Sequence, residues 1–314
     1  MLVLDAEAVR SRAPLPAMIA CLREAFSRRP GEHPRQIVDL SGGAGERLLL
    51  VMPAFDSNGA GAVKLATVSP GNAASGLPTV QAAIVAFSET GTPIAFIDGA
   101  SVTQLRTAAA SALASQYLSR ADSAHLVVIG TGALAPYMAA AHCTVRPIAR
   151  VSVCGRRRES AVATINTIRS LVPSHVELTV AQSVEDAVAS ADIVTCATSS
   201  KTPVLLGRWL KRGVFVDLVG SFSRAAREAD DDVVLRSRIF VDTFAGALAE
   251  AGDLLDPLER GILRRERIEG ELADLVCGRV QGRGDKEESI VFKSVGTAIE
   301  DLAAVRLIVG KTAL

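Results

Sequence analysis

The sequence LVVIGTGALA, residues 126–135, decides the fold of this chain. It begins with four consecutive apolar residues, as a strand buried on both faces of a parallel sheet requires. A Gly-x-Gly-x-x-Ala turn follows, and residues Ala133–Val145 then read as a helix. Gly130 permits a tight turn, Gly132 lets the backbone approach a pyrophosphate, and Ala135 lets the helix pack closely on the sheet. Because a helix start also attracts anions, this order of elements predicts a dinucleotide-binding unit rather than a turn that binds nothing.

A run of three arginines bears on which dinucleotide is bound. The strand expected at Val151–Cys154 ends about 20 residues after the glycines, where an NAD site usually places an acid for the ribose. Here Arg156, Arg157 and Arg158 follow instead. Guanidinium groups pair with a 2′-phosphate, which a carboxylate would repel. A solvated basic turn is the alternative, but the position favours NADP(H), with NAD(H) as the second choice.

Short apolar strands alternate with helical segments from residue 125 onward. After the first two strands, further strands are expected at Val176–Val180, Ile193–Ala197, Val214–Val219 and Ile239–Val241, with helices at Glu159–Leu171 and Ser183–Ala189. Such alternation predicts an α/β fold with a Rossmann-type doubly wound parallel sheet.

The first part of the chain has a different pattern. A helix is expected at Leu15–Phe26, an Ala-rich helix at Val102–Leu118, and strands at Arg47–Met52, Gly61–Thr67, Thr79–Phe87 and Thr92–Asp98. Because turns rather than helices separate these strands, they predict an antiparallel sheet. The amphipathic stretch Val295–Val309 is expected to return to it. We therefore expect a discontinuous α+β domain of residues 1–118 with 293–314, and a Rossmann dinucleotide-binding domain of residues 119–292.

Composition excludes several classes of partner. The 34 basic residues balance the 34 acidic ones and aromatic residues are only 4%, which argues against nucleic acid. The uncharged stretch 123–145 contains Gly130 and Gly132, so we expect a buried strand and helix rather than a membrane span. Five cysteines without a C-x-x-C pair suggest a reducing compartment, and with no signal peptide visible at the N-terminus a cytoplasmic protein is expected. The four histidines are scattered, and no metal site is expected.

Three cations in the non-Rossmann part are candidates for binding a substrate. Lys64 interrupts an apolar strand, Arg106 interrupts the Ala-rich helix, and Arg35 precedes a strand-like run. Each alone is more often a side chain that extends to the surface. Together they suit a small carboxylate or the phosphates of the cofactor.

Several stretches resemble the ornithine cyclodeaminase/mu-crystallin family along nearly the whole chain. They are Met52-Pro53-Ala54, Val63-Lys64-Leu65, Ser75-Gly76-Leu77-Pro78-Thr79, Leu105-Arg106-Thr107-Ala108-Ala109, Gly130-Thr131-Gly132-Ala133, and Val291-Phe292-Lys293-Ser294-Val295-Gly296 followed by Ala298-Ile299-Glu300-Asp301. Each is weak alone, but their combination in this order is specific.

The resemblance implies a homodimer, with the N-terminal sheet and C-terminal helix forming the substrate-binding and dimerisation domain. It implies that Arg35 and Lys64 meet the substrate carboxylate, with Lys64 as the catalytic residue, and that Val295 lies beside the substrate. The cofactor contacts it implies, together with those of the glycine turn and the arginine run, are Thr79, Arg106, Gly130, Thr131, Gly132, Ala133, Arg156, Arg157, Thr198, Val219, Gly220 and Ser294.

One segment departs from the ornithine cyclodeaminase pattern. In the deaminases an Asp after this strand handles the amino groups, and a Lys lies nearby. Here Phe222 occupies the Asp position and Ala226 replaces the Lys. A benzyl group cannot exchange a proton. The run from Ala226 to Val233 and the three-arginine turn instead resemble the mu-crystallin and ketimine reductase branch.

These observations predict an NADPH-dependent reductase of small cyclic imino acids of the pyrroline-2-carboxylate type, transferring hydride to a C=N bond. The alternatives are an ornithine cyclodeaminase that makes proline and ammonia, an amino-acid dehydrogenase, and a non-catalytic NADPH-dependent binding protein of the mu-crystallin type.

Overall fold

The computed structural model describes residues 1–28, 34–43 and 47–310, and the chain divides into two compact units. Unit 1 contains residues 1–106 and 297–314, and unit 2 contains residues 107–296. The division falls inside helix α3 (Gly99–Leu118), whereas the expected domain boundary lies at the end of that helix. The reason is that the second part of α3 bonds with unit 2: the Ser111 hydroxyl donates to Asp217 there at 3.0 Å.

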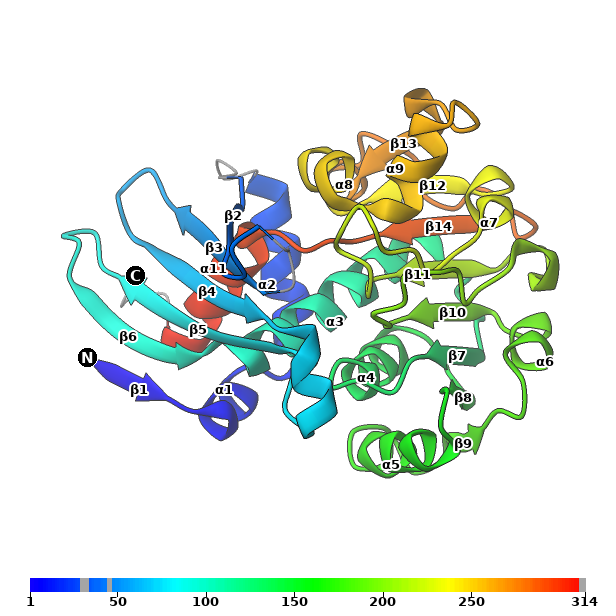
Figure 1. Ribbon diagram of the computed structural model, residues 1–314, viewed down its shortest axis with the longest axis horizontal. Coiled ribbons are helices and arrows are strands. Elements are labelled where there is room, and N and C mark those ends of the chain that lie inside the picture. Colours follow the sequence, from blue (N-terminus) through cyan, green and yellow to red (C-terminus); the bar gives the residue numbers. More distant parts are fainter. Residues whose placement is uncertain (29–33, 44–46, 311–314) are drawn as a thin grey trace. The chain divides into compact units, whose positions relative to one another are not determined.

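Unit 1 is built on a six-stranded sheet (Figure 1). Its strands, in order across the sheet, are β1 (Leu2–Leu4), β6 (Pro93–Asp98), β5 (Val80–Phe87), β4 (Gly61–Val68), β3 (Leu48–Phe55) and β2 (Gln36–Asp39). The pairings from β2 to β6 are antiparallel, as the turn-separated strands predicted, while β1 pairs with β6 in parallel. The other elements of the unit are α1 (Ala6–Arg12), α2 (Leu15–Arg28), the 3₁₀ turn η1 (Pro70–Ser75), the start of α3, and α11 (Ala298–Val309).

The two faces of this sheet have different environments. Helix α11 packs on β3, β4 and α2, and covers one face. The strand register places Leu4, Ile97, Ile84, Lys64 and Met52 in one row across that covered face. All five are buried, and four of them are apolar. Lys64 therefore occupies a position where the pattern of the sheet calls for a hydrophobic side chain.

Unit 2 is built on an eight-stranded sheet in which every pairing is parallel. The strand order is β13 (Ile268–Glu271), β12 (Arg238–Val241), β14 (Ile290–Lys293), β11 (Phe215–Leu218), β10 (Ile193–Cys196), β7 (His125–Ile129), β8 (Arg150–Cys154) and β9 (Glu177–Val180). Its helices besides α3 are α4 (Ala135–Val145), α5 (Arg158–Arg169), α6 (Val184–Ala189), α7 (Asp231–Leu235), α8 (Phe244–Glu250), α9 (Gly252–Glu259) and α10 (Leu272–Val276), with 3₁₀ turns η2 (Gly207–Trp209) and η3 (Arg265–Arg267). The expected doubly wound fold is confirmed.

The faces of the parallel sheet are covered by different helices. Val194 of β10 and Val216 of β11 pack in one apolar cluster with Val188 of α6 and Val233 of α7. The alternate residues point the other way, so Asp217 of β11 receives hydrogen bonds from α3 and from His142 of α4. Strand β7 has β8 on one side and β10 on the other. Strands β8 and β9 are added on one side of β7, whereas β10 and β11 are added on the opposite side. Ligands of such sheets bind at the carboxyl ends of the strands where this order of addition reverses.

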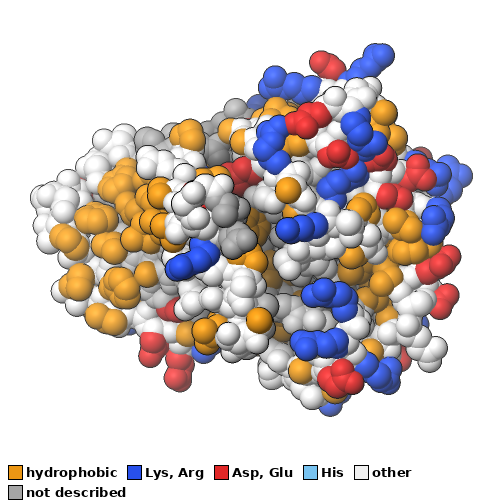
Figure 2. Space-filling view, viewed as in Figure 1, with side chains coloured by type: hydrophobic (Ala, Val, Ile, Leu, Met, Phe, Trp, Pro, Cys, Tyr) orange, Lys and Arg blue, Asp and Glu red, His pale blue; other side chains and the backbone are white. Residues whose placement is uncertain are grey.

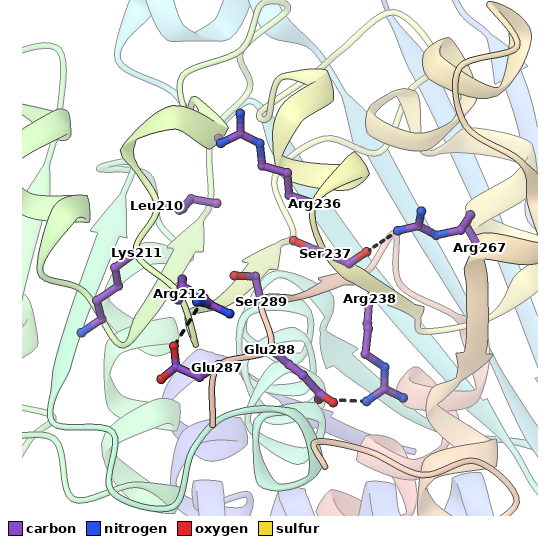
Figure 3. A pocket seen from close by; sticks show the side chains of 11 residues that line it. Leu210, Lys211, Arg212, Arg236, Ser237, Arg238, Arg267, Glu287, Glu288 and Ser289 are labelled. Atoms are coloured by element: carbon purple, nitrogen blue, oxygen red, sulfur yellow. Dashed lines mark hydrogen bonds and ion pairs between the residues drawn. The ribbon is translucent and has the colours of Figure 1, made fainter. Parts of the chain in front are cut away.

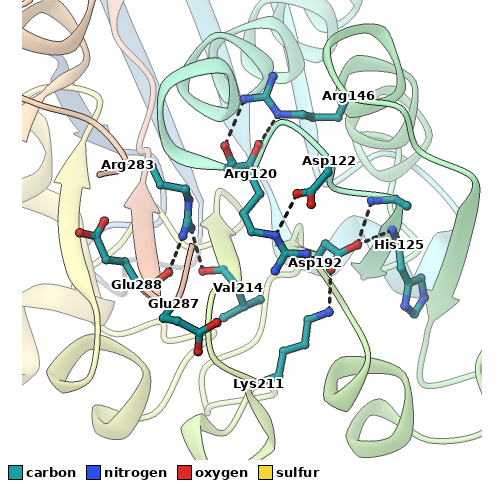
Figure 4. A network of polar contacts seen from close by, with 12 residues as sticks. Arg120, Asp122, His125, Arg146, Asp192, Lys211, Val214, Arg283, Glu287 and Glu288 are labelled. Atoms are coloured by element: carbon teal, nitrogen blue, oxygen red, sulfur yellow. Dashed lines mark hydrogen bonds and ion pairs between the residues drawn. The ribbon is translucent and has the colours of Figure 1, made fainter. Parts of the chain in front are cut away.

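A polar network ties the amino ends of these strands together (Figure 4). Asp192, just before β10, accepts hydrogen bonds from the backbone N–H groups of Ala124 and His125 and ion pairs with Arg120 and Lys211. The bonds from these donors hold the pKa of Asp192 well below its usual range, against the effect of its partial burial. The network fixes the edge of the sheet opposite to the expected ligand edge.

Candidate functional site

The turn after β7 requires glycine at its first position. Gly130 has a φ of +126° and its N–H donates to the carbonyl of Cys154 at 2.9 Å. A Cβ at this position would lie 2.4 Å from the carbonyl oxygen of Ala197, the residue that follows β10. The turn is thereby held between the ends of β8 and β10, at the point where the strand order reverses.

The rest of the turn is open to solvent. A Cβ on Gly132 would meet no atom within 4 Å, and both Gly132 and Ala133 are exposed. In the described part of the chain, the backbone N–H groups of Gly132, Ala133 and Leu134 have no acceptor, and no side chain caps α4. These N–H groups and the positive end of the helix dipole suit a pyrophosphate. The open cradle therefore fits the diphosphate of a dinucleotide.

The arginine run lies beside this cradle. Arg156, Arg157 and Arg158 are exposed and follow β8, whose last residue Cys154 is bonded to Gly130. Among the residues that the structure describes, no carboxylate forms an ion pair with any of the three. A cluster of unneutralised guanidinium groups at this place fits a phosphate on the adenosine ribose.

The loops after β10 and β11 contain the next group of expected cofactor residues, and a buried glutamate joins them. Glu228 accepts hydrogen bonds from the backbone N–H and the hydroxyl of Thr198, at 2.7 and 2.9 Å. It also accepts from the backbone N–H groups of Gly220 at 2.7 Å and Ser221 at 3.1 Å. Val219 donates its N–H to the carbonyl of Cys196. No role was predicted for Glu228, because in the sequence it is one of several charged residues in the segment 226–233.

In unit 1, Lys64 and Arg106 meet two acids of α11. The Lys64 ammonium lies 2.9 Å from Oδ1 and 2.7 Å from Oδ2 of Asp301. Arg106 contacts Asp301 at 3.1 Å through Nε and Glu300 at 2.5 Å through Nη1. All four side chains are at most 5% exposed. The two cations are therefore fixed in place by carboxylates nearly 200 residues or more away in the sequence.

Electrostatics makes Lys64 an unusual lysine. Burial first, and then the charge of Arg106, lower its pKa to about 8, although Asp301 acts in the opposite direction. Arg35, half-buried just before β2, contributes to the same lowering, which indicates that its charge acts on Lys64. Because it retains a positive charge at neutral pH, the Lys64 ammonium is able to bind an anion such as a carboxylate.

The remaining expected residues lie in two places. Thr79 is half-buried directly before β5, and its carbonyl accepts the N–H of Ser69 at 2.8 Å. Ser294 and Val295 follow β14 in unit 2. The Ser294 hydroxyl and the Val295 N–H donate to Asp242 at 3.1 and 2.8 Å.

The structure brings the expected residues together in two groups. Within unit 2, the carboxyl edge of the sheet carries Gly130, Thr131, Gly132, Ala133, Arg156, Arg157, Thr198, Val219, Gly220, Ser294 and Val295. Within unit 1, Lys64, Arg106 and the charge of Arg35 converge. The described residues contain no group of three His, Cys, Asp or Glu side chains able to hold a metal ion. In the same described ranges, no helix is long and apolar enough to cross a membrane.

Comparison with known proteins shows to which family the chain belongs. The sequence profile of the ornithine cyclodeaminase/mu-crystallin family matches residues 1–313. The chain belongs to this family.

Three relatives illustrate the range of similarity. A Δ(1)-pyrroline-2-carboxylate reductase of Colwellia psychrerythraea is 39% identical over 317 residues, and the match covers 100% of both chains. A solved structure of the Thermococcus litoralis Δ(1)-pyrroline-2-carboxylate reductase, in complex with NADH and L-proline, has a TM-score of 0.93 at 32% identity, and the match covers 98% of this chain and 96% of that one. An archaeal alanine dehydrogenase dimer with bound NAD has a TM-score of 0.89 at 26% identity, covering 98% of this chain and 94% of that one.

The segment after β11 contains Phe222, at the position where the resemblance implies an Asp in the deaminases. Phe222 is partly buried here and packs against an apolar cluster that includes Val295 and Ala247. A phenyl ring in that packing has no proton to give or take. The structure thus places an apolar wall where the resemblance implies an acid in the deaminases.

A hollow of about 420 Å³ at the opposite edge of unit 2 is a poor candidate for this family's chemistry (Figure 3). It is lined by several cations near the amino ends of β11, β12 and β14. Most are already neutralised: Arg238 pairs with Glu269 and Glu288, and Arg212 with Glu287. The hollow therefore offers little net charge to a ligand.

Proposed function

We propose that the protein is an NAD(P)H-dependent reductase of small cyclic imino acids of the Δ(1)-pyrroline-2-carboxylate class. The observation that carries the proposal is the buried Lys64 ammonium, which is held by Asp301, the acid that Arg106 also contacts. The Colwellia and Thermococcus relatives, similar to this chain over nearly all of its length, bear the name of that activity.

The residues of the two units have separate roles in such a reaction. The cofactor, when bound, supplies a hydride for the C=N carbon. The open turn at Gly132 and the start of α4 hold its diphosphate. Lys64, with Arg35, binds the substrate carboxylate and so fixes the carbon for attack. A substrate that arrives as an iminium ion already has its nitrogen proton, so one hydride completes the reduction to a cyclic amino acid, and no acid is needed at Phe222.

The preferred cofactor in this proposal is NADP(H), with NAD(H) also accepted. The support is the exposed, unneutralised run Arg156–Arg158 beside the cradle. The two solved relatives described above hold NADH and NAD, which supports NAD(H) as the second choice. Arg156→Asp combined with Arg157→Ser should move the preference toward NAD(H). An unchanged ratio of kcat/KM for the two cofactors would count against the assignment.

A second copy of the chain is the proposed partner, because the outer face of the unit 1 sheet is apolar. The strand register places Val3, Phe96, Val85, Val63 and Pro53 in one row across this face. Val3 is 74% exposed and Phe96 43%. Figure 2 shows hydrophobic side chains gathered over this part of the molecule. An exposed apolar sheet face of this kind marks an association surface, and the archaeal relative is a dimer.

The deciding assay is oxidation of NADPH and of NADH with a panel of cyclic imines, alongside ornithine and alanine. Turnover of pyrroline-2-carboxylate that is lost in Lys64→Ala supports the proposal. Alanine oxidation with NAD(P) would favour an amino-acid dehydrogenase, the activity named for the archaeal relative. Release of ammonia from ornithine would favour a cyclodeaminase. Cofactor binding without turnover of any of these compounds would leave a non-catalytic binding protein.

A further inference from the structure

Glu228 lies at the centre of the polar groups beneath the carboxyl edge of the unit 2 sheet. It is fully buried and belongs to the segment that connects β11 to α7. Its Oε1 accepts two hydrogen bonds from Thr198 and its Oε2 accepts one each from Gly220 and Ser221. One carboxylate thus joins the loop after β10 to the loop after β11.

The fit of these two loops is tight. A Cβ on Gly220 would lie 2.2 Å from the backbone nitrogen of Thr198 and 2.5 Å from Oε1 of Glu228. Nothing larger than glycine can occupy that position while the carboxylate stays in place. The geometry of both loops therefore depends on the four bonds to Glu228.

A second buried acid fixes Glu228 itself. Asp253 of α9 accepts the backbone N–H groups of Glu228 at 2.7 Å and of Ala229 at 3.0 Å. The Lys293 ammonium of β14 lies 3.0 Å from the other oxygen of Asp253, and both side chains are completely buried. Lys293 thus pairs with Asp253, and its charge also acts on Glu228.

We propose that Glu228 is a positioning residue for the nicotinamide side of the dinucleotide, and that its ionised form is required to hold the two loops in the binding geometry. The inference rests on the proposed function, because it assumes that a dinucleotide extends from the cradle at Gly132 toward these loops. In doubly wound sheets a ligand spans the point where the strand order reverses, and the loops after β10 and β11 lie on the far side of that point from the arginine run.

The surroundings of Glu228 link this role to pH. Burial, and to a lesser extent the charge of Asp253, raise its pKa to about 7, whereas Lys293 and the bonds from Thr198 act in the opposite direction. Cys196 is a further titratable group here, and the charges of Glu228, Asp253 and Asp217 act on it. A protonated carboxyl cannot accept all four bonds, so protonation releases part of one loop. Because the bound state needs the ionised form, binding releases a proton and weakens as the pH falls below about 7.

The test compares two ligands that differ only in the nicotinamide ring. NADPH and 2′-phospho-ADP-ribose share the diphosphate and the 2′-phosphate, so titration of those groups cancels in the ratio of the two Kd values. Wild type, Glu228→Gln and the matched exposed control Glu287→Gln are titrated calorimetrically from pH 5.5 to 8.5. Glutamine keeps one oxygen, and its NH₂ group faces either the N–H groups of Gly220 and Ser221 or the N–H and hydroxyl of Thr198, so at least one N–H loses its acceptor in either orientation.

We expect the ratio of Kd for NADPH to Kd for 2′-phospho-ADP-ribose to rise below pH 7 in wild type and Glu287→Gln, up to tenfold per pH unit. In Glu228→Gln the ratio should be raised roughly 10- to 100-fold at pH 8 and should no longer vary with pH. An equal loss of affinity for both ligands in Glu228→Gln would overturn the inference. A ratio of Kd values that does not vary with pH in wild type would also overturn it, and this second measurement decides even if the variant fails to fold. Failure of wild type to bind either ligand would instead refute the proposed function.

Discussion

Removing the carboxylate of Asp301 tests whether Lys64 binds the substrate as a cation. Asp301 lies within 3 Å of the Lys64 ammonium, and both are buried. The pKa of Lys64 is about 8 with this acid in place, so Lys64 is charged in about 90% of the molecules at pH 7. Loss of an opposite charge at such a distance lowers a lysine pKa by roughly one to three units. In Asp301→Asn the pKa of Lys64 therefore falls to roughly 5–7, and the charged fraction at pH 7 falls by about 2- to 100-fold.

The assay is binding of pyrrole-2-carboxylate, a flat unreactive analogue without a titrating imine, measured by calorimetry against pH in the presence of cofactor. In wild type the affinity should decline above about pH 8, because the ammonium is lost there. In Asp301→Asn the decline should begin one to three units lower, with affinity restored at acidic pH. Asp285→Asn, at an exposed position, is the control. An unchanged pH profile in Asp301→Asn would refute the assignment of Lys64 as the carboxylate-binding cation.

Three further predictions concern the cradle, the amino edge and the outer sheet face. Gly130→Ala should lose NADPH binding and lower the Tm, because the new Cβ would lie 2.4 Å from a carbonyl oxygen. Gly132→Ala should keep the Tm and only weaken binding, because its Cβ would meet no atom within 4 Å. Equal behaviour of the two variants in thermal unfolding and in titration would contradict the geometry of the turn. Asp192→Asn should cost about 1–3 kcal/mol of unfolding free energy at pH 7 in urea titrations. Because the pKa of Asp192 is lowered by folding, that difference should shrink as the pH falls below about 4, and a constant difference would exclude this origin. Phe96→Glu, on the exposed row, should give a monomer in light-scattering measurements, and a persistent dimer would place the interface elsewhere.

Local patterns were sufficient to predict much of the fold. The run before Gly130 is apolar without interruption because β7 is buried on both faces, and the turn and α4 follow as expected. The strands Gly61–Val68 and Val80–Phe87 were predicted because each is a long run of strand-forming residues between two turn-rich segments.

The elements that were missed are short or defined by their neighbours. Strand β14 pairs with β11 and β12 inside the sheet, yet it has four residues and follows a polar segment, so nothing local marks it as a strand. Strand β2, by contrast, is the strand-like run expected after Arg35, although it is four residues long and fully exposed.

The same distinction holds for the site. Lys64 and Arg106 are visible in the sequence because a cation interrupts an apolar pattern. The carboxylates that hold them are not, because Asp301 lies 237 positions from Lys64 and only the packing of α11 on the sheet brings them together. Glu228 has no periodic signal at all, since its burial results from the closure of two loops around it.

The row of side chains that contains Lys64 has an evolutionary consequence. Its four other members are aliphatic or thioether groups packed under α11, and the charge of the lysine is compensated by Asp301, an acid that it shares with Arg106. Replacing buried ion pairs by hydrocarbon of similar volume is often neutral or favourable for folding. Replacement of Lys64 alone would leave the buried carboxylate of Asp301 without one of its cations and is unfavourable, whereas joint replacement of Lys64 and Asp301 by apolar residues leaves Arg106 paired with Glu300 and meets little thermodynamic obstacle. Under the proposed function, such a protein would still bind a nucleotide but would no longer bind the substrate. Under the proposed function, selection for turnover retains the ammonium group there.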